Sequence, residues 1–143
     1  MKYEDDFVPY QLAVRMKEID FDEPCFACWL SRANGFYRIS MYPNEITIDE
    51  KTLAPTYQQA FRWFRENHNV QSYIKYNKSD HVWYSFHITF EVLADGENPP
   101  VNMKHEVDSW LGLNNEYNTY EEAELVCLQK CLSIVKHQLN KKP

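Results

Sequence analysis

The sequence predicts an α+β fold in the order α-ββ-α-ββ-α, with two β-hairpins forming an antiparallel or mixed sheet that is packed by helices. Two observations predict this class. Segments 9–19, 57–67 and 120–139 carry apolar residues at helical spacing, and a pair of alternating segments lies in each interval between them. The pattern Thr-Tyr-(Gln/Glu)-(Gln/Glu)-Ala also occurs twice, at 56–60 and 119–123, each time after such a pair. This echo suggests a tandem hairpin-helix pseudo-repeat with sub-units 25–67 and 70–139.

Length and composition favour one domain, residues 1–143, with a sizeable core. The chain has 44% hydrophobic residues, and 8 Phe, 10 Tyr and 4 Trp against only 3 Gly, which is typical of a compact fold. Its net charge of −6 disfavours nucleic-acid binding, which depends on Lys and Arg to neutralise phosphates. No apolar run reaches the ~20 residues of a membrane span, and the acidic opening is unlike a secretion signal, so we expect a cytoplasmic protein.

Each expected helix has an apolar stripe and a start signal. Pro9 suits the first turn of the first helix, while Thr56 and Thr119 are expected to cap the other two. Gln59 and Glu122 should then reach back to the amide of the capping threonine. The apolar stripes are Leu12, Ala13, Met16 and Ile19 in the first helix; Tyr57, Ala60, Phe61 and Phe64, with Trp63 on the flank, in the second; and Ala123, Val126, Cys127, Leu128, Cys131, Leu132, Ile134 and Val135 in the third.

The first hairpin is expected from segments 25–32 and 36–42, which meet at Asn34-Gly35. A two-residue turn there opposes Leu30 to Ile39 and gives the pair one apolar face. In this register Trp29, Arg38 and Tyr42 share the other face. A linker through 43–55 leads to the second helix.

The second hairpin is expected from 70–77 and the long alternating run 82–92. A loop at 78–80 opposes Tyr76 to Val82 and Ile74 to Tyr84, which leaves Tyr73, Trp83 and His87 on the less apolar face. The segment 94–118 is an irregular insertion that contains breakers at Asp95-Gly96, Pro99-Pro100 and Gly112, and a short helix is expected within 103–111.

The four cysteines do not predict a metal or cofactor. Cys25 and Cys28 have C-x-x-C spacing, but residues three apart on a strand point to opposite faces. Cys127 and Cys131 share the apolar face of the last helix, where cysteine acts as a small hydrophobic residue. We therefore expect buried free thiols, no metal site and no cofactor.

The candidate binding residues are the aromatic and basic side chains on the outer faces of the two hairpins. If both hairpins join one sheet, these residues form one patch rich in Trp, Tyr and Arg, which are frequent at binding hot spots. The alternative is that a helix covers this face and makes it a second core. The candidates are Trp29, Arg38, Tyr42, Tyr73, Trp83 and His87.

Three stretches of the sequence resemble small uncharacterised proteins encoded by phages and prophages of gut bacteria. They are residues 6–13 (DFVPYQLA), 53–66 (LAPTYQQAFRWFRE) and 117–125 (YNTYEEAEL). The resemblance implies no activity and no catalytic residue. A looser similarity, a hairpin followed by a helix starting Tyr-x-x-Ala, is to phage proteins with an α-β-α sandwich, and it implies helices on both sheet faces.

These observations favour a non-enzymatic accessory or interaction protein of a phage or mobile element, whose partner is a host protein, a phage protein or a second copy of the chain. One alternative is a small enzyme or ligand-binding domain with a cleft between the hairpins and the 94–118 insertion, lined by His81, His87 or His105. A Ser85-His87-Glu91 arrangement is too extended for direct proton transfer, since alternate residues of a strand stand about 7 Å apart. The other alternative is single-stranded nucleic-acid binding on the aromatic face.

Overall fold

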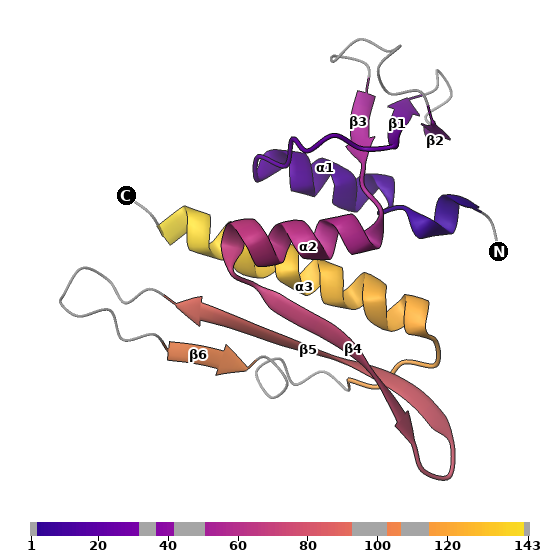
Figure 1. Cartoon of the computed structure of the whole chain (residues 1–143), viewed down its shortest axis with the longest axis vertical. Coiled ribbons are helices and arrows are strands. Elements are labelled where there is room, and N and C mark those ends of the chain that lie inside the picture. The colour runs from indigo at the N-terminus through magenta and orange to yellow at the C-terminus, as the bar shows by residue number, and fades with distance from the viewer. Residues whose placement is uncertain (1–2, 32–36, 42–50, 93–102, 107–114, 142–143) are drawn as a thin grey trace. The chain divides into compact units, whose positions relative to one another are not determined.

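The structure, a computed structural model, describes residues 3–31, 37–41, 51–92, 103–106 and 115–141 and confirms the α+β class (Figure 1). The chain divides into two compact units, residues 1–60 and 61–143. Each unit has its own antiparallel three-stranded sheet in the described part of the chain. The two hairpins therefore lie in different sheets, and the expectation that they join one sheet is wrong. None of the described helices is long and apolar enough to span a membrane.

The first unit combines short helices with the sheet β2-β1-β3. It opens with the 3-10 helix η1 (Tyr3–Asp6) and helix α1 (Tyr10–Glu18). Strand β1 (Ala27–Ser31) lies between β2 (Tyr37–Ser40) and β3 (Lys51–Ala54), and both neighbours are antiparallel to it. The sequence pattern missed β3, which falls within the segment expected to be a linker.

Helix α1 buries the predicted stripe and ends in a defined motif. Leu12, Ala13 and Met16 are buried, as their spacing predicts. At the C-terminus Asp20 takes a positive φ of 68°, and the Phe21 amide donates to the Met16 carbonyl at 3.0 Å. This six-to-one bond after a left-handed residue is a Schellman motif, which closes the helix by satisfying one of its last carbonyls.

The register of the first hairpin differs from the prediction by one residue. Leu30 lies opposite Arg38 rather than Ile39, so Ile39 pairs with Trp29. A shift of one residue moves a whole strand's side chains to the other face of the sheet. Ile39 thereby joins a core cluster with Phe7, Ala27 and Ala54, against which Trp29 packs. Burial of Ile39 in that cluster is the physical reason for the observed register, whereas the expected Asn34-Gly35 turn lies outside the described residues.

Helix α2 (Tyr57–His68) begins at the predicted threonine cap. The Thr56 hydroxyl accepts from the Gln59 amide at 3.2 Å. The expected return bond from the Gln59 side chain is replaced by another, because that side chain donates to the Pro24 carbonyl at 2.9 Å. Trp63 is buried rather than flanking, and its ring meets Phe64 edge to face.

The second unit is a meander of three strands with a long helix. Strand β5 (Val82–Val92) lies between β4 (Gln71–Lys78) and β6 (Met103–Glu106). Strand β6 occupies the start of the segment predicted to be a short helix, so that prediction is wrong for residues 103–106, and 107–114 lie outside the described residues. Helix α3 (Tyr120–Lys141) starts at the predicted cap, where the Thr119 hydroxyl accepts from the Glu122 amide at 3.1 Å. The Glu122 carboxylate accepts from the Asn118 amide instead of the Thr119 amide.

The register of the second hairpin differs from the prediction by two residues, which leaves both faces unchanged. Tyr76 lies opposite Tyr84, and Ile74 lies opposite Phe86. The connecting loop is three residues long, as predicted, but spans 79–81 instead of 78–80. Because the shift is even, the predicted apolar face is the one that packs on α3.

Helix α3 covers this apolar face of the second sheet. Phe86 and Ile88 are buried in it, and the Tyr84 and Tyr120 rings meet edge to face at 6.1 Å. Ser72 also reaches Cys131, where its hydroxyl is a hydrogen-bonding partner of the thiol. The buried side chains of α3 are Ala123, Cys127, Leu128, Cys131, Leu132 and Val135.

The two sheets differ in connectivity. The central strand of the first sheet, β1, is the first strand of its hairpin, whereas the central strand of the second, β5, is the second strand of its hairpin. A tandem duplication would give the same strand order in both units. The repeated Thr-Tyr pattern is therefore explained by shared helix capping, which both threonines perform.

Candidate functional site

The structure describes five of the six predicted binding residues and places them in two different sheets. Trp29 is half-buried and packs against the core cluster of the first unit, and its indole N–H donates to the Val8 carbonyl at 2.9 Å. Arg38 is exposed on the opposite face of the same sheet, as the register requires. The prediction that Trp29 and Arg38 share an outer face is therefore wrong. Tyr42 lies outside the described residues.

The other three residues lie together on one face of the second hairpin. Tyr73 is directly opposite His87, and their rings stack with centroids 5.2 Å apart and planes 29° from parallel. Trp83 projects from the same face of β5, four residues before His87. Tyr73 is 56% exposed, whereas Trp83 and His87 are half-buried. This surface, called here the aromatic face, consists of Tyr73, Lys75, Asn77, Trp83, Ser85 and His87.

Polar side chains fill the space between the aromatic rings. The Asn77 amide donates to the Ser85 hydroxyl at 3.0 Å and so links the two strands diagonally. At the turn end, the His81 and Trp83 rings lie 5.1 Å apart. Lys75 is exposed in the middle of β4. The aromatic face is thus a mixed surface, with rings at both ends and a hydrogen-bonded pair between them.

Among the described residues, Ser85 and His87 do not form a proton-transfer pair on the aromatic face. Ser85 and His87 are alternate residues of β5, about 7 Å apart, and the Ser85 hydroxyl already accepts from Asn77. His81 and His87 are six residues apart, which corresponds to roughly 20 Å along a strand. The side chains of Glu91 and His105 lie outside the described residues. Within the described residues, the predicted histidines do not converge on one point.

Sequence reasoning missed the residues that close the far edge of β5. The Asn115 side chain forms two hydrogen bonds with the Phe86 backbone: its Oδ1 accepts from the amide at 3.1 Å, and its Nδ2 donates to the carbonyl at 2.7 Å. Tyr117 then pairs with Tyr84 through two backbone hydrogen bonds of 2.8 Å. A side-chain amide has the same donor and acceptor as a peptide group, so Asn115 takes the place of a strand residue. In the sequence, Asn115 appears only as part of an asparagine pair, residues 114–115, in a segment that is typical of the end of a helix.

Three of the four cysteines have a raised thiol pKa. All four thiols are free, and Cys28, Cys127 and Cys131 are buried as predicted, whereas Cys25 is half-buried. Burial, and then the Glu23 charge, raises the pKa of Cys25 from 9.0 to about 12. Burial also raises the pKa of Cys28, and the pKa of Cys131 is raised well above its usual value by its hydrogen bond with Cys127 and by burial. Because the thiolate is the reactive form, these thiols are unreactive at neutral pH. In the described part of the chain, no three His, Cys, Asp or Glu side chains group as metal ligands would.

No protein-family model, curated protein or solved structure matches this chain. The resemblance to phage-encoded proteins therefore stays a prediction. The function has to follow from the chemistry of the aromatic face.

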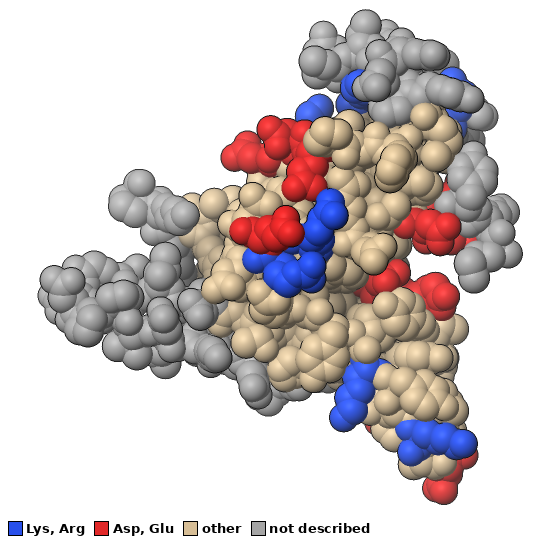
Figure 2. Space-filling model, in the orientation of Figure 1, with Lys and Arg blue, Asp and Glu red and all other residues tan. Residues whose placement is uncertain are grey.

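Charge around the aromatic face is locally basic. Lys75 and Lys78 lie on β4, which carries no acidic residue. Figure 2 shows basic side chains over the turn end of the β4–β5 hairpin, with acidic atoms at its tip, where Asp80 is exposed. The whole chain has a net charge of −6, whereas strand β4 by itself carries two positive charges and no negative one.

Proposed function

We propose that this protein is a non-enzymatic interaction protein that binds a protein partner through the aromatic face of the second hairpin. The observation that carries the proposal is the exposed Tyr73 ring stacked on His87, with Trp83 on the same face of the sheet. Tyrosine and tryptophan are enriched at binding hot spots because each buries a large area with few rotatable bonds. A protein surface is therefore the partner that suits this face.

The aromatic face is held in position before a partner arrives. Tyr73 and His87 fix each other across the strands, and the Asn77–Ser85 hydrogen bond holds the residues between the rings. Binding costs free energy when side chains must be ordered at the interface, so a preordered surface keeps more of the interaction energy. The other face of the same strands packs on α3, whereas Tyr73 on the aromatic face is 56% exposed.

Charge and resemblance support a protein partner from a phage or its host. Nucleic-acid binding relies on many Lys and Arg contacts with phosphate, whereas the aromatic face contains one lysine in a chain of net charge −6. The similarity to phage and prophage proteins supports a phage or mobile-element origin.

The test is a pull-down from bacterial lysate with tagged protein as bait, quantified by mass spectrometry. The test bait is Tyr73→Ala/Trp83→Ala. Its matched control is Phe26→Ala, which removes an aromatic ring that is 77% exposed in the first unit. We expect a stoichiometric partner to be retained by the wild type and the control and lost by the double variant, with circular dichroism showing all three folded. A partner retained by the double variant, or none captured by the folded wild type, would contradict the proposal.

A further inference from the structure

Among the described strands, β4 is the edge strand of the second sheet. It pairs with β5 on one side, and it is the terminal strand in the order β4-β5-β6. It is eight residues long, so its outer edge offers a row of backbone donors and acceptors. The opposite side of β5 is closed by β6 and, further along, by Tyr117 and Asn115.

The bonds on β5 show which backbone groups of β4 point outward. Tyr84 and Phe86 direct their amide and carbonyl groups away from β4, toward Tyr117 and Asn115. In an antiparallel pair, alternate residues exchange hydrogen bonds, so the even-numbered residues of β4 opposite them do not bond to β5. The outward groups therefore belong to Ser72, Ile74 and Tyr76. Within the described residues, no backbone hydrogen bond satisfies them.

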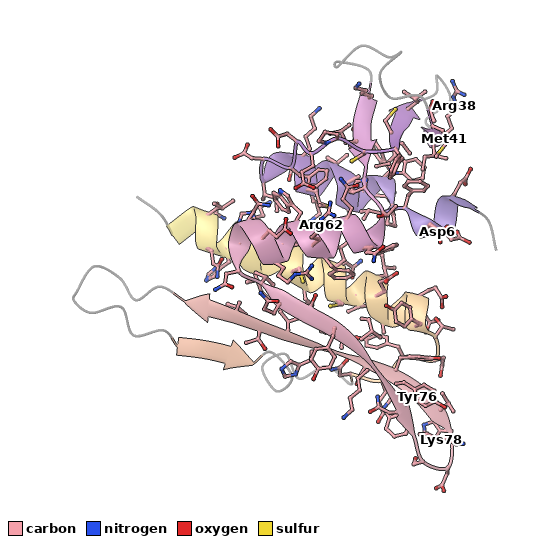
Figure 3. The ribbon with its side chains drawn as sticks, viewed as in Figure 1. Asp6, Arg38, Met41, Arg62, Tyr76 and Lys78 are labelled. Carbon is pink, nitrogen blue, oxygen red and sulfur yellow. The ribbon has the colours of Figure 1, made fainter. Side chains whose placement is uncertain are left out.

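Side chains along this edge are exposed and basic. Tyr73 and Tyr76 are each 56% exposed, and Lys75 and Lys78 are exposed beside them. Figure 3 shows Tyr76 and Lys78 toward the turn end of β4. Across the strand pair, Lys75 faces Ser85 and Lys78 faces Val82, so neither lysine has an acidic residue opposite it. Among the described residues, neither ammonium group forms an ion pair.

We propose that β4 accepts an extended acidic segment of the partner as a fourth strand of this sheet. The inference rests on the proposed function, since it specifies how that partner is held. Backbone hydrogen bonds to Ser72, Ile74 and Tyr76 supply the pairing, and acidic side chains beside Lys75 and Lys78 supply the selectivity. The side chains of the added strand that lie beside Lys75 extend the aromatic face at Tyr73.

Charge also distinguishes this occupant from a second copy of the chain. Self-pairing would bring two further lysines to an edge that already carries two. Repulsion between these like charges opposes association of two copies. An acidic strand from another protein brings charges of the opposite sign to the same edge.

The test uses a blocked synthetic peptide, about as long as β4, in which threonine and glutamate alternate. In an antiparallel arrangement with glutamate opposite Lys75, the threonine amides face β4 and the glutamate amides face away. N-methylation of the threonines should therefore abolish binding, whereas N-methylation of the glutamates should be tolerated. A further control peptide has lysine in place of glutamate. Amide hydrogen exchange of the folded full chain, followed residue by residue by NMR, reports the pairing.

We expect the glutamate peptide to slow exchange at Ile74 and Tyr76 by about tenfold when its concentration is about ten times its dissociation constant. The peptide methylated on threonine and the lysine peptide should have no effect. Lys75→Glu should reverse the preference to the lysine peptide, because in this arrangement the charged peptide side chains lie on the same face as residue 75. No slowing at millimolar peptide, or equal slowing by the peptide methylated on threonine, would overturn the inference. So would protection that increases with protein concentration in the absence of peptide, because it would show self-pairing.

The two proposals fail separately. If the Tyr73→Ala/Trp83→Ala bait loses its partner but the peptide leaves Ile74 and Tyr76 unprotected, strand addition is overturned and the aromatic face stands. If the peptide protects those amides but the double variant keeps its partner, strand addition is supported and the aromatic face is not the binding surface.

Discussion

Replacing Asn115 tests how the open side of β5 is closed. Its side chain makes hydrogen bonds of 3.1 Å and 2.7 Å with the amide and carbonyl of Phe86. A hydrogen bond contributes about 0.5–1.5 kcal/mol net, so Asn115→Ala should lower the free energy of unfolding by about 1–3 kcal/mol. Urea denaturation followed by circular dichroism measures this. Asn118→Ala is the matched control, because Asn118 is exposed and its hydrogen bond to Glu122 is made by its backbone amide. It should change stability by less than about 0.5 kcal/mol.

Asn115→Asp separates the two hydrogen bonds by their chemistry. The aspartate can still accept from the Phe86 amide, but its second oxygen would face the Phe86 carbonyl in place of a donor. Only the protonated acid can donate there, so folding should raise the pKa of the new carboxyl above its usual ~3.9. Stability relative to wild type should then be regained as the pH falls toward that value and lost as the pH rises through the raised pKa. Equal stability of Asn115→Ala and Asn118→Ala, or a pH-independent deficit in Asn115→Asp, would refute the reasoning.

Four further predictions concern stability. Phe86→Ala, at a ring only 6% exposed, should lower the free energy of unfolding in urea by about 3–5 kcal/mol. Phe26→Ala, at a ring 77% exposed, should lower it far less. Similar losses would show that the wrong face of β5 is taken as buried. Thr119→Ala should lower the free energy of unfolding by about 0.5–2 kcal/mol, because α3 loses its N-terminal cap. An unchanged stability would show that this cap does not stabilise the helix. Asp20→Gly should stabilise by up to about 1 kcal/mol in the same assay, because glycine adopts a φ of 68° without strain, and destabilisation would contradict that backbone conformation. The raised pKa of Cys25 contributes stability that is complete below pH 9.0 and is lost as the pH rises toward about 12. Cys25→Ala should therefore lose less stability than the wild type between these two pH values. Equal losses in the two proteins would contradict the raised pKa.

The sequence predicts the helices and the long strands of this fold better than it predicts which strands pair with each other. Helix stripes and threonine caps are local, and the structure confirms the caps at Thr56 and Thr119. The third strand of each sheet is not local. Strand β3 is only four residues long, and so is β6, so neither is long enough for alternation to distinguish a strand from a loop or short helix. Each is stabilised mainly by pairing with a strand far away in the sequence.

The registers explain why three of the six candidate residues lie on the sheet face predicted for them. In the second hairpin the error was two residues, so Tyr73, Trp83 and His87 remained on the predicted face. In the first hairpin the error was one residue, so Trp29 packs against the core cluster and lies on the opposite face from Arg38. A turn dipeptide such as Asn34-Gly35 does not reveal the burial of Ile39, which fixes that register. A register error of an even number of residues keeps each side chain on its predicted face, whereas an odd error moves it to the other face. A sheet face can therefore be assigned from a sequence only when the register is known to within an even number of residues.

Site-specific photo-crosslinking tests the central claim, that the aromatic face binds a protein, most directly. A photoreactive phenylalanine analogue is placed at Tyr73, and in a matched protein at Phe26, and the bacterial cells that produce each protein are irradiated. The account predicts one dominant covalent adduct with another protein from position 73 and none from position 26, because Tyr73 belongs to the aromatic face and Phe26 is an exposed ring outside it. An adduct from position 26 alone, or none from position 73 in folded protein, would contradict the account.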